Sequence, residues 1–84
     1  RIQKISEQML QKYIPKARKA LEEVTNHFKG DKSIQSVLEN AELYLDDAEK
    51  FQSQGKSELA VLSMGYAEGL IDALRFSKGI DPWA

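Results

Sequence analysis

The chain of 84 residues contains no cysteine, which excludes disulfide bonds and thiolate metal sites. It contains one histidine, His27, and no zinc-binding pattern, phosphate-binding glycine loop or Ser/His/Asp set. We therefore expect a protein that is not an enzyme and that has no catalytic residues, no metal site and no cofactor. We interpret His27, near the end of a predicted helix, as a helix-terminal cation rather than a catalytic base.

Long hydrophobic runs are also missing from the chain. No segment approaches the roughly 20 apolar residues that a membrane-spanning helix needs, and no signal peptide is visible. Patterns typical of strands, internal repeats and linkers are absent as well. We expect one all-α domain over residues 1–84 of a cytoplasmic protein that does not bind membranes.

Helical periodicity is what the sequence does contain. Apolar residues recur at intervals of three and four, and short turns with glycine separate the periodic segments. This pattern predicts an antiparallel three-helix bundle, because short turns join antiparallel neighbours. The expected helices cover about 2–29, 33–54 and 57–78, and a tail covers 79–84. The expected N-caps are Asp31 or Ser33 for the second helix and Ser57 for the third.

Pro15 interrupts the first predicted helix and leaves two possibilities open. The helix either continues with a kink or begins at Pro15. In a straight helix, the earlier apolar residues Ile2, Ile5 and Met9 fall about 100° away from the apolar stripe that follows. A kink would turn both stripes inward, whereas in the alternative residues 1–12 project and pack on another subunit.

The third predicted helix has the widest apolar arc, so we expect it to be the most buried of the three. Tyr66 is expected to face the core. Gly65, Gly69 and Ala73 form a stripe of small residues beside the large ones. Each glycine costs about 1 kcal/mol relative to alanine in a helix interior. We therefore predict that the stripe lets neighbouring helices approach closely.

Charge is divided along the chain, although the net charge is −1. Basic residues outnumber acidic ones in residues 1–32, and the reverse holds in residues 33–84. We interpret this as complementarity between the first helix and the acidic second helix. Lys12, Lys16 and Lys19 form a basic stripe that could contact nucleic acid. Because the chain has neither a further aromatic platform nor a net basic charge, we do not expect a nucleic-acid partner. The acids with helical spacing in the second helix are interpreted as a solvated face rather than a cation site: Glu39, Glu42, Asp46 and Glu49.

Residues 44–81 read YLDDAEKFQSQGKSELAVLSMGYAEGLIDALRFSKGID. The Tyr-Leu-x-Asp-Ala element, the glycine turn and Tyr-Ala-x-Gly-x-x-Asp-Ala resemble a family of small archaeal proteins catalogued as domain of unknown function 357. Residues 12–24, KYIPKARKALEEV, are similar to the first helix of that family. The resemblance implies a helical hairpin with one more helix, in an archaeal cytoplasm, and no known activity. The chain departs from the family pattern at Glu68 and Leu70, where histidine and an aromatic residue are frequent.

Two groups of residues are candidates for a functional surface. The first is a polar cluster that forms a small pocket if its members converge, or else fixes helix register through hydrogen bonds: Tyr44, Asp47, Tyr66 and Asp72. The second is a set of apolar residues beyond the needs of one small core: Ile2, Ile5, Met9, Leu43, Phe76 and Trp83.

The favoured function is a protein-interaction or self-association module, with a protein partner or a homo-oligomer such as a dimer. The alternative is a helical module that binds a small ligand or RNA through the polar cluster or the lysine stripe.

Overall fold

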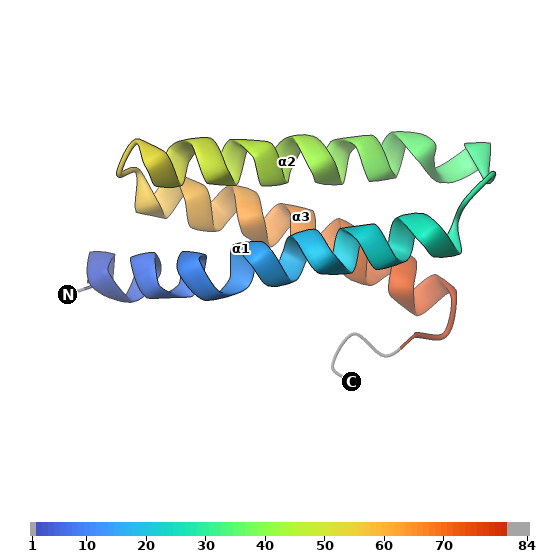
Figure 1. Cartoon of the computed structure of the whole chain (residues 1–84), viewed down its shortest axis with the longest axis horizontal. Coiled ribbons are helices and arrows are strands. Elements are labelled where there is room, and N and C mark those ends of the chain that lie inside the picture. The colour runs from blue at the N-terminus through green and yellow to red at the C-terminus, as the bar shows by residue number, and fades with distance from the viewer. Residues whose placement is uncertain (1, 81–84) are drawn as a thin grey trace.

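Three long helices and one short 3-10 helix make up the fold (Figure 1). The computed structural model describes the backbone of residues 2–80 and the side chains of residues 7–80. The helices are α1 (Ile2–His27), η1 (Lys32–Ile34), α2 (Gln35–Ser53) and α3 (Ser57–Ser77). Each long helix packs against the other two, and α2 and α3 share the most extensive contact. The predicted antiparallel three-helix bundle is therefore confirmed, and the predicted helix ends agree to within two residues.

Each helix buries one narrow stripe whose members are three and four residues apart. This spacing is the two-in-seven pattern by which long helices pack side by side. The stripe of α1 and the residue after it consists of Leu10, Ile14, Ala17, Leu21, Val24 and Phe28. Those of α2 and α3 consist of Leu38, Ala41, Leu45, Ala48, Ser57, Ala60, Met64, Ala67, Ile71 and Leu74. Five of these sixteen members are alanine and none is glycine, so alanines supply most of the small side chains at the helix contacts.

Helix α1 runs through Pro15, so the predicted alternative that the helix begins there is wrong. Pro15 lacks the N–H that would bond the carbonyl of Gln11. Both residues lie on the exposed side of α1, where water can satisfy that carbonyl. Leu10 and Ile14 are buried and lie in line with the apolar stripe after Pro15. The buried side of α1 is therefore continuous through Pro15, and it needs no kink to face the bundle.

The turns follow from their glycines and caps. Gly30 and Gly55 have φ angles of +86° and +74°, a region that glycine enters without steric cost. Asp31 caps η1, because its carboxylate accepts a hydrogen bond of 3.0 Å from the backbone N–H of Ser33. Ser57 is not the N-cap of α3: it is the first helical residue, it is buried, and Lys56 precedes it.

An ion-pair cluster joins α1 to α2. Arg18 contacts both Asp46 and Glu49, and its Nη2 lies 2.8 Å from Oε1 of Glu49. The two carboxylates raise the pKa of Arg18 above its usual value, mainly through the hydrogen bond to Glu49. The contacts agree with the predicted complementarity between the basic first helix and the acidic second helix.

Candidate functional site

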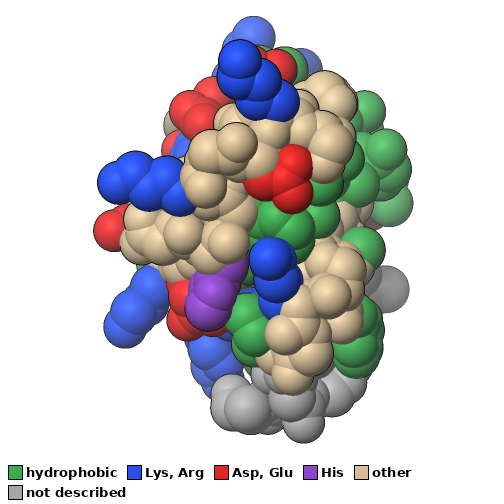
Figure 2. All heavy atoms as spheres, turned by 90° about the vertical axis from the view of Figure 1, so that its right-hand side faces the viewer, with side chains coloured by type: hydrophobic (Ala, Val, Ile, Leu, Met, Phe, Trp, Pro, Cys, Tyr) green, Lys and Arg blue, Asp and Glu red, His purple; other side chains and the backbone are tan. Residues whose placement is uncertain are grey.

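The side of α3 that points away from α1 and α2 is covered by apolar and small residues. Its four large and three small members, which we call the outer face of α3, are Leu59, Leu62, Gly65, Tyr66, Gly69, Ala73 and Phe76. The large side chains are between 46% and 70% exposed. In Figure 2, which looks along the bundle, hydrophobic side chains gather on the right, the side of α3.

Charge is scarce on this face. With about 100° of rotation per residue, Glu58 is the one charged residue of α3 that points outward with it. The other charged residues of the helix, Glu68, Asp72 and Arg75, lie along α1 instead. The result is an apolar surface about 25 Å long between Leu59 and Phe76, which are 17 residues apart at about 1.5 Å each, with Glu58 at its N-terminal end.

Several predictions for α3 are therefore wrong. Tyr66 is 54% exposed and does not face the core. Gly65, Gly69 and Ala73 are exposed and do not sit between neighbouring helices of the bundle. A Cβ atom added at either glycine would meet nothing within 4 Å. Because α3 buries only a two-in-seven stripe, part of its wide apolar arc lies outside the bundle.

The predicted polar cluster is divided between two sides of α3. Tyr44 and Tyr66 do come together, with ring centroids 4.4 Å apart and planes tilted by 49°. They form the edge where α2 borders the outer face of α3. Asp47 is exposed on α2, and Asp72 lies in a groove between α1 and α3.

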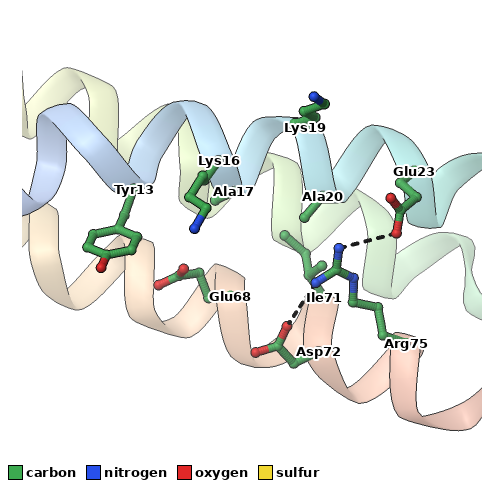
Figure 3. Close-up of a pocket in the computed structure, with 10 residues that line it drawn as sticks. All are labelled: Tyr13, Lys16, Ala17, Lys19, Ala20, Glu23, Glu68, Ile71, Asp72 and Arg75. Atoms are coloured by element: carbon green, nitrogen blue, oxygen red, sulfur yellow. Dashed lines mark hydrogen bonds and ion pairs between the residues drawn. The ribbon is translucent and has the colours of Figure 1, made fainter. Parts of the chain in front are cut away.

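This groove has a volume of about 460 Å³ and is shown in Figure 3. Its lining residues come from α1 and α3: Tyr13, Lys16, Ala17, Lys19, Ala20, Glu23, Glu68, Ile71, Asp72 and Arg75. Nη2 of Arg75 lies 3.2 Å from Oε1 of Glu23, and its Nη1 lies 4.0 Å from Oδ1 of Asp72. Arg75 thus joins α1 to α3 at one end of the groove.

Two carboxylates of the groove are partly desolvated. Burial raises the pKa of Glu68, the nearby charge of Asp72 raises it further, and Lys16 opposes both effects. Burial also raises the pKa of Asp72, and the charge of Arg75 opposes it. In Figure 3, Lys16 and Glu68 extend toward each other from the two helices.

The three lysines of the α1 stripe are exposed, and two of them lie beside Tyr13. Nζ of Lys12 and Nζ of Lys16 lie 5.4 Å and 5.6 Å from the ring centroid of Tyr13, within range of a cation–π interaction. Lys19 lines the groove with acidic residues. His27 is exposed at the end of α1.

The apolar residues predicted as an interface are scattered. Phe76 belongs to the outer face of α3, whereas Leu43 stands on α2, 58% exposed. Met9 of α1 is 39% exposed. The side chains of Ile2 and Ile5 and the whole of Trp83 lie outside the described residues.

None of the helices described is both long and apolar enough to cross a membrane. Within residues 7–80, no three His, Asp or Glu side chains gather where they could hold a metal ion. The acidic residues predicted as a solvated face are exposed, and Asp46 and Glu49 contact Arg18.

The fold and surface define a class of protein: a small three-helix bundle with one exposed apolar helix face. Residues 12–80 match the family described as "Protein of unknown function (DUF357)", so the chain belongs to that family and the predicted resemblance is confirmed. No curated protein and no solved structure matches the chain.

Sequence reasoning missed the outward position of Leu59 and Leu62. The buried residues of α3 follow one strict pattern of three- and four-residue steps from Ser57 to Leu74. Both leucines, and Tyr66, fall outside that pattern. Choosing the strict two-in-seven stripe over the wide apolar arc would have placed them on the surface.

Proposed function

We propose that this protein is a non-enzymatic helical module that binds another protein through the outer face of α3. The observation that carries the proposal is the exposure of Leu62, which is 70% accessible on a helix face whose one outward-pointing charged residue is Glu58. Single exposed leucines are ordinary, but contiguous apolar surface is uncommon on soluble monomers and marks interaction sites. The neighbours of Leu62 at helical spacing include Leu59 and Tyr66, so the exposed surface is contiguous.

The buried core of the fold does not include the residues of this face. Both hydrophobic clusters of the core form from the opposite stripe of α3. Helical glycines such as Gly65 and Gly69 cost about 1 kcal/mol each and relieve no crowding inside the bundle. Residues that cost stability and remain exposed favour a role in contact with another molecule.

Leu43 provides a matched control on a different helix. It is also an exposed leucine, but its neighbours at helical spacing on α2 are polar: Glu39, Asn40, Asp46 and Asp47. An isolated leucine of this kind carries no prediction of binding.

The test is photo-crosslinking with a photoreactive phenylalanine at position 62 or at position 43. Each purified chain is irradiated in an extract of its source cells, and the adducts are compared by mass spectrometry. The proposal predicts a discrete adduct with a protein that forms from position 62 and not from position 43. Equal adducts from both positions, or none from position 62, would contradict it.

A further inference from the structure

We propose that the outer face of α3 takes a second copy of this chain, with the two α3 helices antiparallel and a two-fold axis at Gly69. This inference rests on the proposed function, since it names the partner of the same surface. It starts from the order of large and small residues around Gly69. Leu62 and Phe76 lie seven residues before and after it, and Gly65 and Ala73 lie four before and four after.

A two-fold axis at Gly69 would place the large residues on one side of Gly69 against those on the other side of Gly69 in the second copy. In an isologous interface the same patch serves both copies, and residues equally far from the axis on opposite sides meet each other. Leu62 therefore packs beside Phe76 of the second copy, and Gly65 faces Ala73 of the second copy. Gly69 meets Gly69 of the second copy at the centre.

Close approach of the two helices accounts for the glycines. Helix axes that pack through ordinary side chains lie about 8–10 Å apart, and small residues at the contact allow a shorter distance. A Cβ atom at Gly65 or Gly69 would meet nothing inside the chain, so the space above them is open to another backbone. With the small residues central and the large ones at both ends, the large side chains fill the space beside the crossing point.

The charge distribution favours the antiparallel direction. Glu58 is the one charged residue that points outward with the face. Parallel helices would place the two copies of Glu58 side by side, whereas antiparallel helices separate them by about 30 Å. Antiparallel helix dipoles also attract, and parallel ones repel.

The surface area that this dimer would bury is that of a weak complex. With roughly 200 Å² for a large apolar residue, the exposed fractions of Leu59, Leu62, Tyr66 and Phe76 amount to roughly 450 Å² per copy. With the small residues and Tyr44 the dimer buries about 1,000 Å² in total, the low end for specific complexes. The expected dissociation constant is micromolar, about 10–100 μM.

Disulfide trapping tests the arrangement directly, because the chain has no cysteine of its own. Single variants Leu62→Cys and Phe76→Cys, which leave the central glycines intact, are oxidised separately and as a mixture at about 100 μM chain, where a dimer of this affinity is populated. Leu43→Cys measures random collision. Circular dichroism in reductant verifies that each variant is folded.

The proposal predicts that the mixture of Leu62→Cys and Phe76→Cys forms the mixed dimer at least about tenfold faster than Leu43→Cys links to itself, because pairing raises the effective concentration of the two thiols. Each of the two variants dimerises slowly alone, since Leu62 and Phe76 lie seven residues from the axis on opposite sides. Fast self-linking of both variants would mean parallel helices and would overturn the axis at Gly69.

The photo-crosslinking at position 62 separates failure of this inference from failure of the proposed function. If the mixture of Leu62→Cys and Phe76→Cys links no faster than Leu43→Cys while position 62 labels a different protein, the second copy is excluded and the binding surface remains. If neither experiment yields an adduct, both proposals are overturned.

Discussion

The two kinds of glycine in this chain have opposite roles at the scale of single residues. Gly55 has a φ angle of +74° in the turn between α2 and α3, where a side chain is strained. Gly69 is helical and lies under open space. Substitution by alanine therefore has opposite effects at the two positions.

We expect Gly69→Ala to raise the free energy of unfolding by about 0.5–1 kcal/mol, because alanine favours the helix and meets no neighbour. Gly55→Ala should lower it by about 1 kcal/mol or more. Urea unfolding at low micromolar concentration, where the chain is monomeric, measures both. A loss of stability in Gly69→Ala would contradict the open position of this residue.

At the scale of elements, the packing of α1 against α3 changes the pKa of Glu68, which lies in the groove between them. Burial against α1 raises the pKa of Glu68 above its ordinary 4.5, with Asp72 adding to the effect and Lys16 opposing it. Between the ordinary pKa and the raised pKa of Glu68, the folded chain binds more protons than the unfolded chain. The contribution of Glu68 to stability therefore falls as the pH rises through this range.

Glu68→Gln removes this titration. We expect the variant to be more stable than the parent at pH 7, by a few tenths of a kcal/mol because solvent screens a partly exposed group. The difference should vanish at about pH 3, where the parent carboxyl is protonated. Denaturation at both pH values measures it, with Glu42→Gln on α2 as the control. Lower stability of Glu68→Gln at pH 7 would mean that attraction to Lys16 outweighs burial.

The elements were predictable from sequence because turn glycines and periodic apolar residues are local signals. Gly30 and Gly55 end helices as expected. Which side of α1 is buried near its N-terminal end was less predictable, since Met9 and Leu10 are adjacent and both apolar. Only contact with α2 and α3 decides that Leu10 is buried and Met9 is partly exposed.

The candidate surface was harder to predict than the fold. Phe76 was expected to be exposed, but Tyr66 was assigned to the core and the glycines to contacts inside the bundle. A wide apolar arc on a helix is equally compatible with two neighbouring helices of the same chain and with one such helix plus another molecule. The number of helices that cover α3 is a property of the whole fold, and sequence periodicity does not contain it.

At the scale of the whole molecule, three narrow buried stripes make a bundle with extents of 42 × 24 × 14 Å. A two-in-seven stripe on each helix satisfies the core and leaves the rest of each helix outside. On α1 and α2 that remainder is largely charged, whereas on α3 it is apolar. We therefore expect the molecule to have one surface for association, the outer face of α3.

The most direct test measures the stability of Leu62→Glu against the parent as a function of protein concentration, with Leu43→Glu as the matched control. At about 1 μM the account predicts equal stability, because Leu62 lies outside the core. At about 500 μM the parent should be more stable by about 1–2 kcal/mol, since association favours the folded state. Leu43→Glu should match the parent at both concentrations. A full loss of stability already at 1 μM would place Leu62 in the core of the monomer, and no difference at either concentration would contradict association through α3.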